Sequence, residues 1–463
     1  MQENQAVNRA GNCGESRLTI KQKLGFGIFD LGGNLFFTIM AFWVLNYLTD
    51  TVGIAASLVG TALMIGKVWD AVTDPLLGFI TDRTLSRWGR RRGYLLFGAV
   101  PMCLAMFFLF TAPVYLPQSM HFVWAVAALI ILNTAATIIN VPYSSLTPEL
   151  TSDYHEQSSL NGYRFGCAVF GTLIGAGAVQ PLVKIFARPG TADPLVDQRG
   201  FSMMGLVMGA VIMLVTLITF FGTKEKKYRK EDLPTEGFFP TFLAVFKNKP
   251  YVQLLMTYAL HITGITFLTT ILVFYTKSVL GRADITTIAM VLLLVTAMLF
   301  IPVSVLVSKK IGKRRTYQIC FAVIASACAG IYTLGHRMPV EFFFGIMVYA
   351  GIGVGFSYVA PFAMVPDVIE YGAGKTGERK EGAYYGIWTF TSKLGTALAI
   401  FIAGQILEWS GYIAQAGGTA AVQPPEVFNA IRIIIGPIPI AIFIAAIIVI
   451  QFYPLDSKAR IQS

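Results

Sequence analysis

The segment GKVWDAVTDPLLGFITDRTLSRWGRRR, residues 66–92, places charged residues inside a long apolar run that ends in a cluster of arginines. A charged side chain at the centre of a bilayer costs about 2.5–3.5 kcal/mol, so such residues are rare in membrane-spanning helices and usually functional. An arginine cluster directly after an apolar run is typical of the cytoplasmic end of such a helix. The segment therefore predicts a transmembrane helix that carries a functional site.

The composition of the whole chain agrees with a membrane location. Of its 463 residues, 55% are hydrophobic and only 13% are charged, with a mean hydropathy of +0.63. Twelve apolar segments are each long enough to cross about 30 Å of hydrocarbon as a helix. They lie roughly at 25–48, 53–82, 94–114, 121–148, 162–186, 201–222, 249–278, 284–308, 316–335, 341–369, 383–409 and 428–453. The sequence thus predicts an all-α membrane protein with twelve transmembrane helices.

The net charge of +11 indicates orientation rather than nucleic-acid binding. Basic clusters precede the first segment and follow the second, sixth, eighth, tenth and twelfth, so they lie on one side of the membrane, although Lys184, Arg188 and Arg199 partly break this pattern. We expect both termini in the cytoplasm and the protein in the inner (plasma) membrane. We also expect a monomer in contact with membrane lipid, no nucleic-acid partner and no signal peptide.

Internal repetition divides the chain into two halves. The stretch TDRTLSRWGRRRGY is echoed by VSKKIGKRRTY, and VPYSSLTPEL by APFAMVPDVI, both at an offset of roughly 220 residues. The expected units are an N-terminal tail (1–24), a six-helix half (25–222), a linker (223–248), a second six-helix half (249–453) and a C-terminal tail (454–463). Parallel six-helix repeats around a central cavity are the arrangement of the major facilitator superfamily.

Two aspartates in the opening segment form a candidate cation site. Asp70 and Asp74 lie near the middle of the predicted helix, and their i, i+4 spacing places both carboxylates on one face. Pro75 has no N–H, so a backbone carbonyl one turn earlier is free to join them. Such oxygen ligands suit sodium or a proton. The alternative is a structural Lys67–Asp70 ion pair with Asp74 capping a loop.

Other polar residues inside apolar segments are candidates for ligand binding. A sugar offers hydroxyls for hydrogen bonds and an apolar C–H face for stacking on an aromatic ring. The candidate substrate-binding residues are Asp30, Asn34, Asn140, Arg164, Trp388 and Lys393, and Thr137 is added to the cation site. For Asn34, Thr137 and Asn140, contacts between helices are an equally reasonable role. His261 is predicted to be a packing residue.

Lys393 is expected to link the two sites. An ammonium in a low-dielectric environment needs an anionic partner, and the acids at the same depth are Asp70, Asp74 and Asp30, all in the other half. Lys67, one turn above Asp70, is a candidate coupling residue, and the candidate gating residues near the cytoplasmic ends are Asp82, Arg91, Asp367, Arg379 and Glu381. Because exposed ion pairs are individually weak, these charges would have to close the cavity as a network.

Three motifs resemble those of the glycoside-pentoside-hexuronide:cation symporter family of the major facilitator superfamily. They are GKVWDAVTDPLLG with SRWGRRR, NVPYSSLTPELTSD with Arg164, and PDVIEYGAGKTGERKEGAYYGIWTFTSKLG, and the resemblance covers nearly the whole chain. It implies that Asp70 and Asp74 carry the coupling cation, that Lys393 lies between the cation and sugar sites, and that Arg164 lines the cytoplasmic side of the cavity.

The expected function is therefore cation-coupled symport of a sugar or glycoside by alternating access, with no cofactor. The WDAVTDP and VPYSSLT patterns are also similar to those of animal lysophospholipid transporters, so a lysolipid or other amphipathic substrate is the alternative. A channel or a membrane enzyme is less favoured, because the sequence contains no filter segment, no HExxH or GxSxG motif and no Cys/His cluster.

Overall fold

The computed structural model describes residues 18–84, 86–89, 91–113, 117–150, 154–191, 197–223, 245–335, 337–376, 381–413 and 422–455. These residues form helices and the turns that connect them. The predicted linker and both predicted tails lie largely outside the described residues.

The helices of the first half follow the predicted apolar segments. They are α2 (Ile20–Gly27), α3 (Phe29–Phe42), α4 (Val44–Asn46), the π-helical turn η1 (Tyr47–Thr51), α5 (Ala56–Arg83), α6 (Arg92–Leu109), α7 (Gln118–Leu150), α8 (Tyr154–Gly177), α9 (Val179–Phe186) and α10 (Gln198–Gly222). The first predicted segment is thus not one helix but four short consecutive pieces.

The second half repeats this order. It comprises α12 (Lys249–Phe274), the π-helical turn η4 (Tyr275–Val279), the 3₁₀ turn η5 (Ala283–Ile285), α13 (Thr286–Ile311), α14 (Lys313–Thr333), α15 (Val340–Thr376), α16 (Glu381–Trp409), α17 (Pro425–Ile435) and α18 (Pro437–Gln451). The last predicted segment is interrupted at Gly436, where a Cβ would lie 2.7 Å from the Cβ of Tyr332. Pro437, which lacks an N–H, then begins α18 at a position where no helical donor is needed.

Twelve membrane crossings account for these helices. Among the described residues, ten helical stretches are long and apolar enough to span a bilayer, and the pair α8 and α9, bent by 45°, adds an eleventh. The twelfth is α5, which is 28 residues long but carries Lys67, Asp70 and Asp74 in its apolar run. The predicted all-α membrane fold is confirmed.

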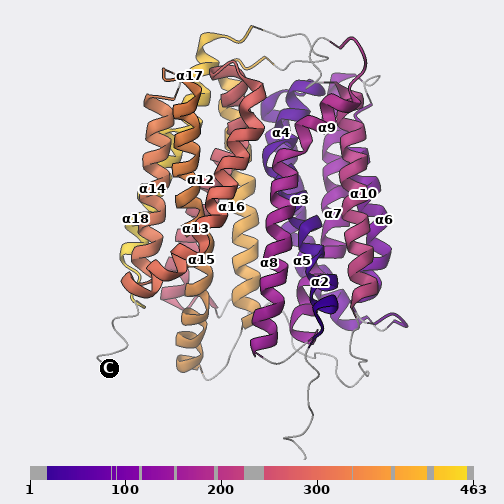
Figure 1. Ribbon diagram of the computed structural model, residues 1–463, viewed down its shortest axis with the longest axis vertical. Helices are drawn as coiled ribbons and strands as arrows, with labels where there is room; N and C mark the ends of the chain where they lie inside the picture. Colours follow the sequence, from indigo (N-terminus) through magenta and orange to yellow (C-terminus); the bar gives the residue numbers. More distant parts are fainter. Residues whose placement is uncertain are drawn as a thin grey trace, which may run out of the picture.

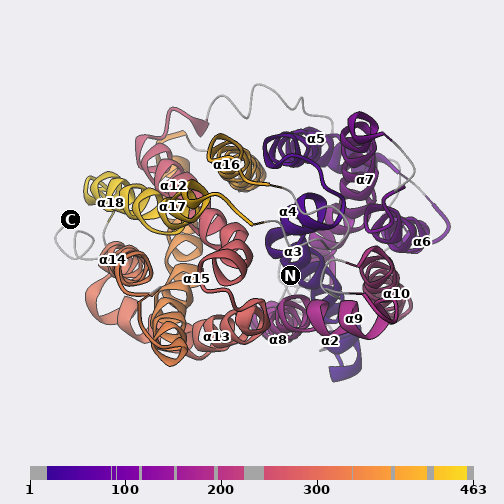
Figure 2. The same ribbon diagram turned by 90° about the horizontal axis from the view of Figure 1, so that it is seen from above.

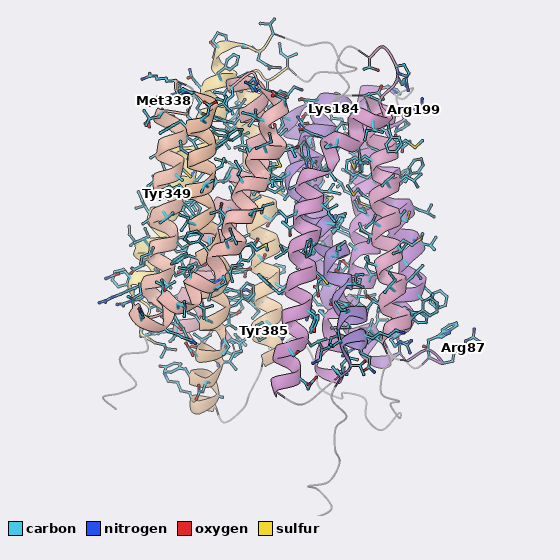
Figure 3. The ribbon with its side chains drawn as sticks, viewed as in Figure 1. Arg87, Lys184, Arg199, Met338, Tyr349 and Tyr385 are labelled. Carbon is cyan, nitrogen blue, oxygen red and sulfur yellow. The ribbon has the colours of Figure 1, made fainter. Side chains whose placement is uncertain are left out.

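The two halves stand side by side with their helices roughly parallel. Figure 1 shows α2–α10 on one side and α12–α18 on the other. Seen from above, α5 lies beside α16 and α8 beside α13, so these four helices form the boundary between the halves (Figure 2). We call the end at which α2 begins and α18 ends the lower end, and the end that carries α9 the upper end. Arg87 lies at the lower end, whereas Lys184 and Arg199 lie at the upper end (Figure 3).

Helices α5 and α16 touch through backbone atoms near the upper end. A Cβ on Gly404 would lie only 2.5 Å from the carbonyl oxygen of Ala56, and a Cβ on Gly60 would lie 3.1 Å from that of Ile400. Small residues at a helix–helix interface allow this close approach, which supplies van der Waals contact where lipid offers no hydrophobic driving force. The pair Gly60 and Gly404 therefore fixes where the two halves meet.

Candidate functional site

Three charged residues and one threonine, which we call the charge cluster, bridge the two halves near the middle of α5 and α16. Asp70 and Asp74 of α5 meet Lys393 of α16, whose Nζ lies 2.8 Å from Asp70 Oδ2 and also donates to Asp74 Oδ2. The hydroxyl of Thr137 in α7 donates to Asp70 Oδ1 at 2.9 Å and shares contact with Asp74 Oδ1 at 3.1 Å. The expected meeting of Lys393 with both aspartates across the halves is confirmed, and Thr137 joins them.

The cluster has the chemistry of an exchangeable cation site. Its carboxylate and hydroxyl oxygens are hard ligands, and Pro75 lies inside α5 beside them. Lys67 lies one turn earlier, with its Nζ 3.9 Å from Asp70 Oδ2, which is beyond hydrogen-bond distance. Among the described residues, no group of three or more His, Cys, Asp or Glu side chains is placed to hold a metal ion. Because Lys393 contacts both carboxylates, a cation that binds the aspartates would compete with its ammonium.

A second charged group lies lower in the first half. Arg164 of α8 donates through Nε to Asp30 Oδ2 of α3 at 2.7 Å, and Tyr143 of α7 donates to the same oxygen. The ring of Tyr143 also stacks on Phe29. The sequence predicted Asp30 and Arg164 separately but missed Tyr143. Its signal was its position within the VPYSS motif, one turn after Asn140.

The two predicted amides bond within their own helices. The Nδ2 of Asn34 donates to the Asp30 carbonyl at 2.8 Å, and that of Asn140 donates to the Ala136 carbonyl at 2.9 Å. Each bond uses one of the two N–H donors of the amide, so the second donor and the side-chain oxygen can still bind a ligand.

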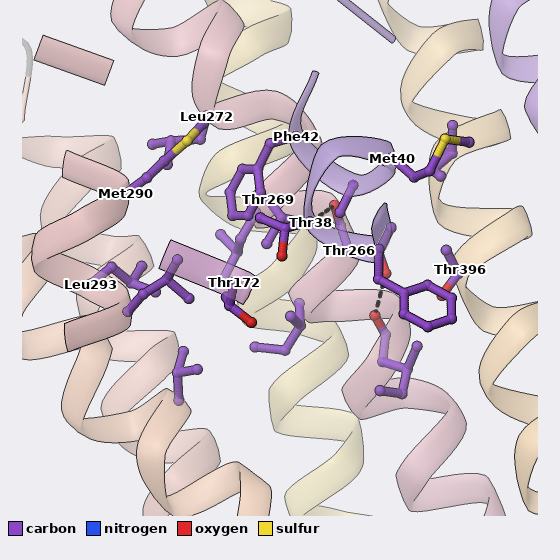
Figure 4. Close-up of a pocket in the computed structure, with 18 of the residues that line it drawn as sticks. Thr38, Met40, Phe42, Thr172, Thr266, Thr269, Leu272, Met290, Leu293 and Thr396 are labelled. Atoms are coloured by element: carbon purple, nitrogen blue, oxygen red, sulfur yellow. Dashed lines mark hydrogen bonds between the residues drawn. The ribbon is translucent and has the colours of Figure 1, made fainter. Parts of the chain in front are cut away.

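A cavity of about 470 Å³, which we call the main cavity, lies between the halves. Helices α3, α5 and α8 of the first half and helices α12–α17 of the second supply its mainly apolar wall. Threonines add hydroxyls to this wall, and Thr172 of α8 and Thr269 of α12 point toward the same space (Figure 4). Asn34, Lys67 and Lys393 line the cavity. Its size suits a small-molecule ligand.

Trp388 lies outside this wall. Its ring is buried and stacks on Tyr258 with centroids 3.8 Å apart, while Phe362 meets it edge-on. Asp30, Asn140 and Arg164 also do not line the cavity. The predicted substrate residues thus fall into two groups, with Asn34 and Lys393 at the cavity and the others below it or in the packing of one half.

The predicted cytoplasmic gating charges make contacts within each half. Arg91 donates to the Ser145 carbonyl of α7, and Lys313 of α14 pairs with Asp367 of α15 at 2.7 Å. Arg379 and the side chains of Asp82 and Glu381 lie outside the described residues. His261 is a packing residue as predicted, because its Nδ1 is 2.8 Å from the Tyr317 hydroxyl in a buried aromatic cluster.

An ionic clasp that the sequence reasoning missed joins the halves at the upper end. Asp50 of η1 is fully buried and lies 2.6 Å from Lys277 of η4 and 2.6 Å from the Tyr412 hydroxyl. Asn46 also donates to it at 2.9 Å. Nearby, Gln180 of α9 bonds to the second half through the Ala283 carbonyl and Thr287.

The clasp is built from equivalent turns of the two repeats. Both η1 and η4 are five-residue π-helical turns that begin with tyrosine, and each is followed by a glycine with positive φ, Gly53 and Gly281. Such π-turns are rare and are frequent at functional sites. The signal in the sequence was the likeness of YLTDTVG to YTKSVLG, with opposite charges in the matching turns.

The chain is similar to known membrane proteins over nearly its whole length. The family model described as MFS/sugar transport protein matches residues 25–457. The isoprimeverose transporter of Lactiplantibacillus pentosus is 26% identical over 437 residues, covering 94% of this chain and 88% of that protein. The putative glycoside/cation symporter YagG of Escherichia coli (strain K12) is 27% identical over 459 residues, covering 97% and 94%. A crystal structure of the nucleoside transporter NupG shares the fold, with a TM-score of 0.62 at 15% identity over 93% of this chain and 99% of that chain.

Proposed function

Because the chain belongs to the MFS/sugar transport protein family, we propose that it is a secondary active transporter that couples movement of a sugar or glycoside to a cation by alternating access. Members of this family are transporters and not enzymes. The relatives described above carry the names of an isoprimeverose transporter and a glycoside/cation symporter, which supports a sugar-like substrate and does not favour a lysolipid.

The observation that carries the proposal is the bridge between Lys393 and the two aspartates. In this bridge, carboxylates of the first half contact an ammonium of the second half. Lys393 also lines the main cavity, so among the described residues the bridge lies directly beside the space for a ligand. In transporters of this architecture, substrate and ion sites lie near the membrane midplane between the repeats. Because both partners are largely buried, replacing either one changes the stability of the contact between the halves.

Coupling follows from competition for the aspartates. A sodium ion or a proton that reaches Asp70 and Asp74 neutralises one of their two negative charges and competes with Lys393 for the carboxylate oxygens, so that the ammonium can turn to meet a substrate oxygen in the cavity. Cation and substrate thus favour the same rearrangement, and each raises the affinity for the other. Thr137 would remain as a ligand of the cation.

The lower end is proposed to face the cytoplasm, because the loops at that end carry the arginine and lysine clusters. The clasp of Asp50 and Lys277 then closes the outer end of the protein, and the structure corresponds to a state closed to the outside. A multi-pass monomer in the inner membrane is proposed. In a cysteine-free background, Arg87→Cys should react with an impermeant maleimide only from the cytoplasmic side and Lys184→Cys only from outside. The opposite result at either position would reverse the orientation.

The function is tested by reconstitution. Purified protein in liposomes should accumulate at least one sugar or glycoside from a panel when an inward sodium or proton gradient is imposed, and should not do so without the gradient. Uptake of the same sugar at equal rates with and without both gradients would contradict symport. Uptake of lysolipids but of no sugar would contradict the proposed sugar substrate and support the lysolipid alternative.

A further inference from the structure

Arg432 places a positive charge in the apolar stretch AIRIIIGPIPI of the last membrane crossing. The residue belongs to α17 and lies about 10 Å along the helix from its first residue, Pro425. The crossing Pro425–Gln451 is the most apolar of the described membrane-spanning helices. A charged side chain in such a stretch is rare and normally has a specific partner.

The guanidinium of Arg432 has no acidic partner among the described residues. Its Nη2 donates to the Tyr332 carbonyl at 3.0 Å, and its Cζ lies 5.0 Å from the centre of the Tyr332 ring. Its Nε is buried and makes no hydrogen bond. By contrast, Lys277 at the same end of the protein pairs with Asp50. The charge of Arg432 is therefore not balanced within the part of the chain that the structure describes.

Helix capping accounts for only one donor of Arg432. The Tyr332 carbonyl belongs to the last turn of α14, where carbonyls have no helical N–H partner and where a cation also interacts favourably with the helix dipole. A guanidinium has five N–H donors, so the others remain for a second acceptor. Leaving such donors without an acceptor is costly away from water.

The surroundings of Arg432 face lipid at the upper end. Arg432 is half-buried, and Asn429, on the same face of α17 one turn earlier, is exposed. The neighbouring Ile433 is 41% exposed. Met338, shortly after the end of α14, is 45% exposed and lies at the upper end in Figure 3. The guanidinium therefore lies between apolar side chains that meet lipid tails and the level of the lipid headgroups.

We propose that Arg432 binds the phosphate of an anionic phospholipid in the leaflet at the upper end. Phosphate oxygens accept hydrogen bonds from the planar guanidinium fork, and the acyl chains lie against the exposed apolar side chains of α14 and α17. A headgroup with a net charge of −1 balances Arg432, whereas a zwitterionic headgroup brings a second cation beside it. This inference does not depend on the proposed sugar transport.

The site is joined to the clasp through the end of α14. The Ile331 carbonyl accepts from the Tyr275 hydroxyl of η4 at 3.2 Å, and the next carbonyl, that of Tyr332, accepts from Arg432. The turn η4 also carries Lys277. A lipid that holds Arg432 in place should therefore stabilise the upper end of the second half and raise the melting temperature of the protein.

Phospholipids that differ only in the headgroup test the proposal. The purified, delipidated protein in a non-ionic detergent is titrated with dihexanoylphosphatidylglycerol, with dihexanoylphosphatidylcholine or with glycerol 1-phosphate, and the melting temperature is measured. The phosphatidylglycerol should bind more tightly than the phosphatidylcholine. Glycerol 1-phosphate, which is the same headgroup without acyl chains, should have no effect at the same concentration.

Variants separate lipid binding from helix capping. Arg432→Gln should weaken phosphatidylglycerol binding roughly 10- to 100-fold, the loss of one charge-assisted hydrogen bond, and Arg432→Lys should retain part of it. Arg199→Gln removes an exposed arginine at the upper end of the other half and should bind like the parent. If Arg432 only capped α14, Arg432→Gln would lower the melting temperature by the same amount with and without the lipid.

Four results would overturn the inference. They are equal binding of the two phospholipids, equal stabilisation by glycerol 1-phosphate, unchanged phosphatidylglycerol binding in Arg432→Gln, and an equal loss of binding in Arg199→Gln. The third would leave Arg432 as a helix cap, and the second would indicate a site for free phosphate esters. If Arg432→Gln does not fold, the comparison of the three ligands on the parent and on Arg432→Lys decides.

Discussion

Asp50→Asn should open the upper end of the protein. The carboxylate of Asp50 is fully buried and receives hydrogen bonds from Lys277, Tyr412 and Asn46. Asparagine keeps the shape and one acceptor oxygen but removes the negative charge. The ammonium of Lys277 is then left beside a neutral amide at the interface between the halves.

The size of the effect can be estimated from the burial of the two partners. Breaking a buried ion pair by removing one partner costs about 3–5 kcal/mol. The side chain of Lys277 retains 19% exposure and can turn toward water, so the lower end of that range, about 3 kcal/mol, applies. Since 1.4 kcal/mol is tenfold, the population closed at the upper end should fall by roughly 100-fold relative to the open one.

Cysteine accessibility measures this population. In a cysteine-free background, Thr269→Cys places a thiol in the wall of the main cavity. Its reaction with an impermeant maleimide added outside should be at least tenfold faster when Asp50→Asn is present. Asp284→Asn is the control, because Asp284 lies at the same end but is 57% exposed and pairs with an exposed Arg282, a contact worth about 0–1 kcal/mol.

The double variant Asp50→Asn with Lys277→Gln separates the charge effect from a general loss of packing. Removing the orphaned ammonium should recover much of the closed population, because the cost arises mainly from an unpaired buried charge. Labelling rates that are the same in Asp50→Asn, in Asp284→Asn and in the parent would refute the clasp as a gate. A double variant more open than Asp50→Asn would do the same.

Three further changes test the central site and the helix contact. Asp70→Asn or Asp74→Asn should abolish cation-driven accumulation but retain part of substrate binding, and an unchanged sodium or proton dependence of uptake in both would exclude the cation site. Lys393→Ala should lose accumulation and Lys393→Arg should not restore it fully, because a planar guanidinium does not replace a compact ammonium between two carboxylates; wild-type accumulation by the alanine variant would reduce Lys393 to a packing residue. Gly404→Ala should lower the melting temperature, since overpacking costs about 1–3 kcal/mol, whereas Gly345→Ala, whose Cβ meets nothing within 4 Å, should not; equal melting temperatures would refute the tight contact.

The central charge cluster could be predicted because the membrane leaves few choices. A lysine within an apolar helix needs an acid at its own depth, and only the first half offered acids there, so the contact of Lys393 with Asp70 and Asp74 followed from the sequence. The same argument brought Asp30 and Arg164 together as candidates of one ligand site, although their direct pairing is visible only in the structure.

Two other features could not be predicted, for different physical reasons. An aromatic ring has no charge to satisfy, so Trp388 fits a sugar site and a core equally well, and only the neighbouring helix shows that it stacks on Tyr258. Asp50 and Lys277 lie at the ends of their membrane segments, where charged residues are common and therefore do not indicate a functional site. Their pairing depends on two π-helical turns that hydropathy does not reveal.

The glycine contact of α5 and α16 has a geometric consequence for the charge cluster. Along α5, Asp70 lies about 15 Å beyond Gly60, and along α16, Lys393 lies about the same distance before Gly404, at a rise of 1.5 Å per residue. If the two helices pivot at the glycine contact, a change of about 10° in their crossing angle moves Asp70 and Lys393 apart by about 3 Å, given that helix rise. That displacement equals the length of a hydrogen bond, so the bridge between ammonium and carboxylates is either made or broken over a small rotation. Whether Lys393 contacts the aspartates would thus depend on the angle between the two halves, and a cation that displaces Lys393 would favour a different angle.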